Sequence, residues 1–374
     1  MVDTRIPRLW QLDADWGRAP WRASPDRIER VLHVHLSTPE EPQTSLCQAL
    51  ASLAGPRGYR RVDWTALPTQ DHHRAVVDAA EALRPTLIFM QLQRPGILAT
   101  AAVAEMRRLA NTSELVIISW CGDVGGINGP FRAAGDQWAY ELSVHCDLML
   151  YTSMSQVRAH RSRAMHNAGY LQIGYDEDRY FEGPDNEHGS RFDVAFLGTN
   201  YNEGHWTGFP EEEVRLRRNI VEAMRKKFGA RFGLFGSGWG TGVAHLPPAQ
   251  SGDVYRHSHL ALNISICNFL ERYSSDRLLR ALACGTPVLM KTFDDWRSLG
   301  LAHGYNVLAW ETVDEAIALG VAWLDPARRE ELREIGRRGA KLVREHHSWG
   351  VRMQELCPLV AAVRCERLDI TRPW

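Results

Sequence analysis

The sequence predicts an α/β protein built from two tandem Rossmann-like domains, each with a doubly wound parallel sheet. Short apolar runs typical of buried strands alternate with helical segments from about residue 30 onward. A polar stretch rich in Gly and Asn, EGPDNEHGSR at 182–191, interrupts this alternation, which then restarts. Such alternation is typical of parallel βαβ units. The 374 residues are enough for two domains with ordinary cores.

The first domain is expected to span residues 1–181. Its strands are predicted at 30–36, 59–64, 86–92, 114–120, 147–153 and 171–175. The helices between them are predicted at 42–54, 70–83, 99–110, 138–146 and 155–169, the last ending at Gly169.

Residues 182–191 are interpreted as the linker, and 192–349 as the second domain. Its strands are predicted at 192–199, 231–237, 260–266 and 288–290. Its helices are predicted at 211–229, 253–259, 313–324 and 326–347, with one more between 272 and 290, and residues 350–374 form a last helix. Open parallel sheets bind ligands at the carboxyl ends of their strands, so a ligand is expected between the domains.

Composition narrows the class of protein and its location. The net charge is −1, so the chain as a whole is a poor partner for a polyanion, although a local patch could still bind one. No apolar run approaches the roughly 20 residues of a membrane helix, and the first residues do not resemble a secretory signal. The seven cysteines form no CxxC pair, which indicates reduced thiols and a cytoplasmic protein.

Several common site motifs are excluded. The glycine-rich GLFGSGWGTG at 233–242 fails the dinucleotide spacing, because Thr241 stands where the third glycine belongs. No G-x-x-x-x-G-K-[ST] and no G-x-S-x-G occurs, which argues against P-loop and serine hydrolase chemistry. The pairs His72–His73 and His346–His347 lack metal-ligand spacing, so they are interpreted as solvent-facing or packing residues and no metal site is expected.

The segment RYSSDRLLRALACGTPVLM, residues 272–290, predicts a helix followed by a buried strand. Ser274, Ser275 and Asp276 are all residues that cap helices, although a cap needs only one of them. Arg277 in the first turn opposes the helix dipole. Either Arg277 pairs with a carboxylate such as Asp276 or Glu271, or the helix entry receives an anion.

With SSDRLLRALACGTPVL followed by GYNVLAW, the chain resembles the GT-B glycosyltransferases, in particular the group related to the CgeB spore-maturation protein and the group 1 glycosyltransferases. DVAFLGT, RFGLFGSGW, VYRHSHLALNIS and LQIGYDEDRYF match further landmarks of that fold in order. The resemblance covers most of residues 170–350, whereas the first domain matches in pattern only. It implies a GT-B architecture, a nucleotide-sugar bound by the second domain, and a last helix that crosses back to the first domain.

The resemblance also implies the donor-binding residues. A nucleotide-sugar donor, with UDP-sugar preferred, would be held without a required cofactor or metal, because helix ends and Arg can neutralise a diphosphate. The helix entry contributes Ser274, Ser275, Asp276 and Arg277. Two glycine loops contribute the remaining candidates, Gly198, Thr199, Gly238 and Trp239. Gly198 and Thr199 could instead form a plain turn, and either serine could be a cap only.

One departure from the family pattern concerns two glutamates spaced E-x7-E. Arg272 and Arg280 occupy those positions here, so the ribose and sugar contacts of the glutamates must be made differently. Some CgeB-like sequences carry an arginine three residues before the second glutamate, and Arg277 matches it.

Two residues are candidate bases for the acceptor hydroxyl. Asp123 follows the strand ELVIISW among glycines and is either a base or a residue shaping a turn. His35 ends the first strand and is either the base or a packing residue. A retaining mechanism would require neither as a base.

The acceptor is left open. Arg and Trp residues of the N-terminus, together with the basic helix at 155–169, could bind nucleic acid, so a hydroxymethylated base in DNA is one candidate acceptor. The alternative is a packed tail and a solvated helix face. A sugar-nucleotide epimerase of the same architecture and a DNA-binding protein with a vestigial cleft are the competing functions.

Overall fold

The computed structural model describes residues 28–36, 42–55, 58–92, 96–122, 139–163, 165–183, 190–201, 210–240, 243–244 and 246–370. The Arg- and Trp-rich N-terminus, Asp123 and most of the linker predicted at 182–191 lie outside these ranges.

The first domain is built on a sheet of six parallel strands in the order β2-β1-β3-β4-β5-β6. These strands are β1 (Val31–His35), β2 (Tyr59–Asp63), β3 (Leu87–Met90), β4 (Val116–Cys121), β5 (Leu148–Tyr151) and β6 (Ala168–Tyr170). The helices are α2 (Thr44–Ala54), α3 (His72–Leu83), α4 (Thr100–Ala110) and α7 (Met154–Arg161). Alternate residues of a strand face opposite layers. Phe89 and Ile118 therefore pack with α2, while Ile88 and Ile117 pack with α3 and α4.

The second domain contains a sheet of five parallel strands in the order β11-β10-β9-β7-β8. The strands are β7 (Phe192–Leu197), β8 (Phe232–Phe235), β9 (Ser258–Asn263), β10 (Val288–Lys291) and β11 (Leu308–Trp310). The helices are α8 (Glu211–Phe228), α9 (Pro248–Arg256), α10 (Asp276–Ala283), α11 (Val313–Trp323) and α12 (Arg329–His346). Short 3-10 turns are η1 (Trp64–Ala66), η2 (Thr69–Asp71), η3 (Gly229–Arg231), η4 (Trp296–Leu299) and η5 (Pro326–Arg328). The two doubly wound sheets confirm the predicted α/β class.

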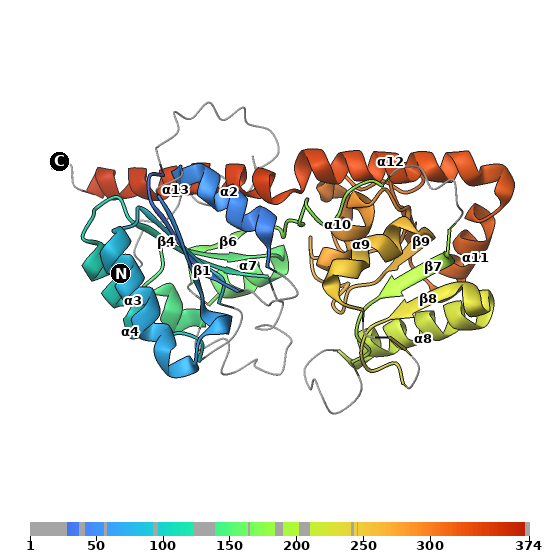
Figure 1. Cartoon of the computed structure of the whole chain (residues 1–374), viewed down its shortest axis with the longest axis horizontal. Coiled ribbons are helices and arrows are strands. Elements are labelled where there is room, and N and C mark those ends of the chain that lie inside the picture. Colours follow the sequence, from blue (N-terminus) through green and yellow to red (C-terminus); the bar gives the residue numbers. More distant parts are fainter. Residues whose placement is uncertain are drawn as a thin grey trace.

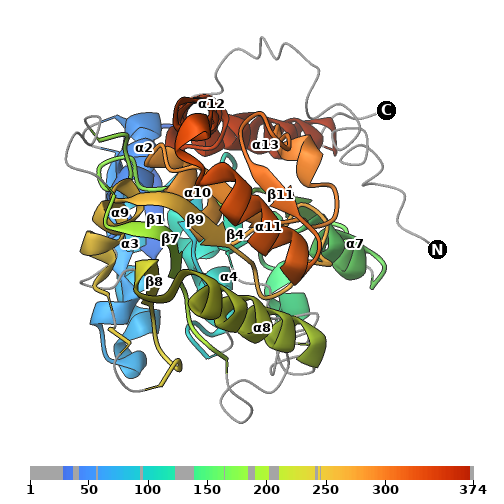
Figure 2. The same cartoon turned by 90° about the vertical axis from the view of Figure 1, so that its right-hand side faces the viewer.

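The two domains lie side by side, and one helical run spans both of them (Figure 1). In Figure 2, which looks onto the second domain, α12 and α13 (Trp349–Ile370) follow one another along the same edge of the molecule. α13 packs against α2, and Trp349, Met353 and Leu356 are part of the core of the first domain. The last helix therefore shares its apolar core with the first domain.

The largest differences from the sequence prediction are the ends of two helices and the strand β11, which was not predicted. The helix expected at 155–169 ends at Arg161, and residues 168–170 form β6 beside β5. Consequently, the strand expected at 171–175 is mostly irregular chain. The helix expected at 253–259 is α9, which begins at Pro248 and ends at Arg256. Helical periodicity alone could not locate β6, because its pairing with β5 depends on a distant segment.

A neutral histidine joins α12 to α13. His347 Nε2–H donates to the Leu299 carbonyl at 2.9 Å, and Nδ1 accepts a hydrogen bond from Arg352. Burial, followed by the charge of Arg352, lowers the pKa of His347 to about 3. The folded protein thus keeps this ring uncharged, whereas the unfolded chain protonates it below about pH 6.5.

This difference predicts an acid-sensitive contribution to stability. The contribution is complete above pH 6.5 and is lost as the pH falls toward 3, because only the unfolded state gains the proton. When the pH falls from 7 to 5.5, the free energy of unfolding should decrease by about 1 kcal/mol less in His347→Gln than in the natural protein. Urea denaturation at each pH measures the loss, with the exposed His166→Gln as control. Parallel pH curves for the natural protein and His347→Gln would contradict this expectation.

Candidate active site

A pocket of ≈ 280 Å³ opens between the two domains, with walls from both. On the first domain it is lined after β1 by Leu36 and after β4 by Gly122, and on the second domain after β7 by Tyr201 and after β9 by Ile266. The pocket thus lies at the carboxyl ends of both sheets, where open parallel sheets bind ligands. The entry of α10 forms a continuous part of its wall through Tyr273, Ser274, Ser275, Asp276, Arg277 and Arg280.

The two serines at the entry of α10 have different roles. Ser275 occupies the N-cap position, but its side chain makes no cap hydrogen bond. Instead its hydroxyl accepts from Asn263 Nδ2 at 3.3 Å, and its amide donates to Ser265 Oγ at 2.9 Å. Ser274 is 2% exposed, and its hydroxyl has no partner among the described residues. A buried hydroxyl without a partner is costly unless a ligand or water satisfies it.

Arg277 pairs with neither of the carboxylates that the sequence offers it. Asp276 Oδ2 lies 2.7 Å from Arg280 Nη2, and Glu271 is bound in a two-pronged pair by Arg158. Arg277 Nε is buried and has no hydrogen-bond partner among the described residues. The guanidinium therefore stands at the pocket wall without a carboxylate from the described part of the chain.

A second arginine adds positive charge behind this wall. Arg217 of α8 is 1% exposed, and its guanidinium donates to the carbonyls of Thr199 and Ile264, each at 3.1 Å. Burial, and then the charge of Arg277, lower the pKa of Arg217 to about 10, so it remains charged at neutral pH. The neighbouring charges of Arg217 and Arg277 repel each other and create a positive potential at the pocket wall. A bound anion would reduce this repulsion.

The two glycine loops contact each other and the side chain of Arg277. A Cβ on Gly198 would come within 2.9 Å of the Phe196 ring, which is too close, and within 3.6 Å of Arg277 Nε, an ordinary contact. The Gly198 carbonyl accepts from Trp239 Nε1 at 2.6 Å, and the Gly238 carbonyl accepts from Asn200 Nδ2 at 3.1 Å. Gly198 thus neighbours Arg277, but none of the four loop candidates, Gly198, Thr199, Gly238 and Trp239, lines the pocket.

The arginines that replace the family's glutamates have separate environments. Arg280 lines the pocket, pairs with Asp276 and lies over the Tyr180 ring, 5.1 Å from its centroid. Arg272 has a positive φ of 57° and pairs through Nε with Asp295 at 2.6 Å, outside the pocket lining. A cation therefore stands at the pocket where those family members have a carboxylate.

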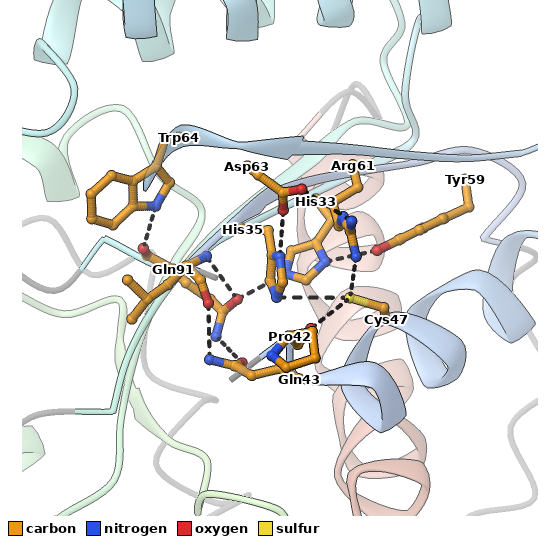
Figure 3. Close-up of polar contacts among 11 residues, drawn as sticks. His33, His35, Pro42, Gln43, Cys47, Tyr59, Arg61, Asp63, Trp64 and Gln91 are labelled. Atoms are coloured by element: carbon orange, nitrogen blue, oxygen red, sulfur yellow. Dashed lines mark hydrogen bonds and ion pairs between the residues drawn. The ribbon is translucent and has the colours of Figure 1, made fainter. Parts of the chain in front are cut away.

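His35 lies away from the pocket, although the next residue, Leu36, lines it. Its side chain is fully buried, with Nδ1 2.6 Å from Asp63 Oδ1 and Nε2 3.7 Å from Cys47 Sγ (Figure 3). The structure thus does not bring His35 together with the α10 residues. Asp123 lies outside the described residues, but its neighbour Gly122 lines the pocket.

Sequence reasoning did not select most of the pocket lining, which includes the polar residues Gln43, Asp176 and Tyr201. Asp176 Oδ1 accepts from the Ser45 amide at 2.7 Å, which ties the entry of α2 to the pocket wall. The landmark GYDEDRY contains Asp176, so that motif was the available signal. Gln43 and Tyr201 lie in loops without a motif, and only the fold places them here.

In the basic segment 155–169, considered above for DNA binding, three basic side chains contact other parts of the protein. Arg158 pairs with Glu271, Arg161 donates to the Ala168 carbonyl at 2.8 Å, and His160 is buried against the Tyr151 ring. The same region fastens the domains together, because the Glu271 carbonyl accepts from the Met154 amide at 3.0 Å. These contacts fix the segment leading into α10 against the first domain.

In the described part of the chain, every helix is too short or too polar to span a bilayer.

The chain is similar to known proteins mainly through its fold. Residues 215–358 match the family described as glycosyl transferase-like. A comparison with curated proteins found no match. Among solved structures, sucrose-phosphate synthase from Thermosynechococcus elongatus matches with a TM-score of 0.54 at 12% identity, over 90% of this chain and 99% of the other. HepE from Anabaena, solved with UDP and glucose, matches with a TM-score of 0.56 at 11% identity, over 89% and 100%.

A structure from Listeria monocytogenes, provisionally assigned as a UDP-N-acetylglucosamine 2-epimerase, also matches. Its TM-score is 0.52 at 12% identity, over 92% of this chain and 98% of the other. Together these findings define the class: the protein has the GT-B fold, and its second domain has a glycosyl transferase-like sequence. The resemblance to GT-B glycosyltransferases predicted from the sequence is confirmed.

Proposed function

We propose that this protein is a glycosyltransferase that moves a sugar from a nucleotide-sugar, with UDP-sugar preferred, to an acceptor hydroxyl. The observation that carries the proposal is a pair of buried polar groups at the entry of α10, Arg277 Nε and the Ser274 hydroxyl, which have no partner among the residues that the structure describes. Both belong to residues that line the interdomain pocket. The glycosyl transferase-like match over 215–358 and the UDP complex of HepE support the same choice.

In this proposal the α10 entry holds the diphosphate of the donor. The first amides of a helix and a forked guanidinium both favour phosphate oxygens. As the bond to the sugar breaks, negative charge grows on the departing diphosphate, and Arg277 with Ser274 would stabilise it. Because fixed positive charge is already present at Arg277 and Arg217, the proposal requires no metal or cofactor.

The acceptor belongs to the first-domain side of the pocket. Asp123 remains the proposed base, since it follows Gly122 of the pocket lining. We do not propose His35 as the base, because its imidazole is buried against Asp63 and Cys47. The acceptor class is a hydroxyl, and the internal contacts of α7 argue against that helix as a DNA-binding surface. The proposal keeps the cytoplasmic location expected from the cysteine pattern of the sequence.

Thermal denaturation with a panel of nucleoside diphosphates and their sugars tests the donor site. UDP and UDP-sugars should raise the melting temperature most, by the equivalent of about 2.7 kcal/mol when free ligand is 100-fold above its Kd. Matched nucleosides without phosphates should have little effect, because the proposed contacts are to the diphosphate. Absence of any nucleotide effect would overturn the proposal. Conversion of a UDP-sugar to its epimer without acceptor would identify an epimerase instead.

A further inference from the structure

A second polar cluster lies beside the pocket, inside the first domain and outside the proposed donor site. It joins β1, the edge strand β2 and the start of α2 (Figure 3). Its central group is the thiol of Cys47, which is 8% exposed. The residues around the sulfur are His33 and His35 of β1 and Tyr59, Arg61 and Asp63 of β2.

Asp63, His35 and Cys47 form a chain of three side chains. Asp63 Oδ1 lies 2.6 Å from His35 Nδ1, so the carboxylate keeps the proton of the ring on Nδ1. The other nitrogen, Nε2, then faces Cys47 Sγ at 3.7 Å as a proton acceptor. The same thiol has one alternative acceptor, the Pro42 carbonyl at 3.9 Å.

A guanidinium approaches the sulfur from a different side. Arg61 Nη1 lies 3.6 Å from Cys47 Sγ, and Arg61 Nη2 lies 3.0 Å from Asp63 Oδ2. The Tyr59 hydroxyl, 2.9 Å from His33 Nδ1, is a further donor near the cluster. Burial alone would raise the pKa of the Cys47 thiol, but the hydrogen bond and charge of His35, with the hydrogen bonds of Arg61 and Tyr59, outweigh it and leave the pKa lowered.

The other cysteines provide a contrast within the same chain. Burial raises the pKa of Cys146, Cys267 and Cys284 to about 12, and the hydrogen bonds that Arg256 and a backbone group give Cys284 do not offset it. Cys365 is exposed on α13. A thiolate is the nucleophile in cysteine chemistry, so its environment and not exposure alone decides reactivity.

We propose that Cys47 is a peroxide-sensitive thiol, held by His35, Arg61 and Asp63 in a form that attacks small soft electrophiles. The thiol proton moves to His35 Nε2, and the sulfur attacks one oxygen of hydrogen peroxide. A sulfur–oxygen bond forms as the oxygen–oxygen bond breaks. The departing hydroxide takes the proton from His35 and leaves as water, so that Cys47 becomes a sulfenic acid and the peroxide is reduced.

This thiol is linked to the pocket through the entry of α2. The Cys47 amide donates to the Gln43 carbonyl at 3.1 Å, and Gln43 lines the pocket. Two residues before Cys47, the Ser45 amide holds Asp176 at the pocket wall. An oxygen added to the buried sulfur must displace its neighbours, and Gln43 lies one helical turn away. Oxidation is therefore expected to alter the first-domain side of the pocket.

Alkylation of the full chain with iodoacetamide from pH 6 to 9, read by peptide mass spectrometry, tests the reactive form. The alkylation rate at each cysteine is divided by the rate of the same cysteine at the highest pH. This ratio removes differences in how easily iodoacetamide reaches each thiol. At pH 6.5 Cys47 should keep a larger share of its high-pH rate than Cys365, because His35 and Arg61 lie within reach of its sulfur and stabilise the thiolate. Coincident profiles for the two residues would overturn the proposal.

A peroxide experiment tests the oxidation directly. One equivalent of hydrogen peroxide with dimedone, which traps sulfenic acids, should label Cys47 before Cys365. The variant Arg61→Gln should fold, because the Arg61 side chain is 40% exposed and belongs to an edge strand. It should slow the labelling of Cys47 several-fold and leave the labelling rate of Cys365 unchanged. Labelling at Cys365 with none at Cys47, or an unchanged Cys47 rate in Arg61→Gln, would contradict the proposal.

Discussion

Arg277→Ala is expected to lower kcat/KM for nucleoside diphosphate release by roughly 10²–10³-fold, the usual cost of removing one donor that stabilises transition-state charge. The nucleotide-sugar with the largest thermal shift serves as substrate. Stability should stay unchanged or rise slightly, because Arg277 Nε has no hydrogen-bond partner among the described residues and the nearby charge of Arg217 repels it. Loss of activity without loss of stability separates a ligand contact from a structural one.

Two matched variants make this result specific. Arg277→Lys keeps the charge but loses the planar fork, so it should retain intermediate activity. Arg215→Ala removes an arginine of α8 whose side chain is 61% exposed and paired with Glu211, and should leave kcat/KM unchanged. Full activity in Arg277→Ala would remove the main support for the proposed donor site.

Arg217→Met is expected to lower the free energy of unfolding by about 3 kcal/mol, because two carbonyls lose the charged donor that the buried Arg217 side chain provides. These are the carbonyls of Thr199 and Ile264, at the ends of β7 and β9. Methionine fills part of the space but donates no hydrogen bond. The midpoint of urea denaturation measures the effect, with an unchanged slope showing that the same transition is followed.

The same substitution should also weaken UDP binding, since Arg217 packs over the ring of Tyr201, a pocket residue. The control is Arg215→Met, two residues earlier on α8, where the side chain is exposed. This variant should change the free energy of unfolding by no more than about 0.5 kcal/mol. If both variants had equal stability, Arg217 would not be the buried support that its two carbonyl contacts indicate.

Most of the order of strands and helices, β6 and β11 excepted, was readable from the sequence because local patterns carry it. Alternating apolar runs, the polar break near 182–191 and the stops at Gly229 and Gly285 each depend on neighbouring residues only. The helix boundaries that moved most, at Arg161 and at the start of α9, lie where local signals were ambiguous. β6 forms because it can pair with β5, and a helical pattern does not encode that partner.

The α10 entry shows the same division at the level of side chains. By itself, the sequence determined that a helix begins after Ser275, that Arg277 lies in its first turn, and that two open α/β sheets create a cleft. Only the tertiary structure decided that Arg277 stays without a carboxylate from the described residues. Asp276 turns to Arg280 four residues on, and Glu271 is taken by Arg158 from the other domain, 113 residues away. Ion pairs follow distance in space, and the chain's packing sets that distance.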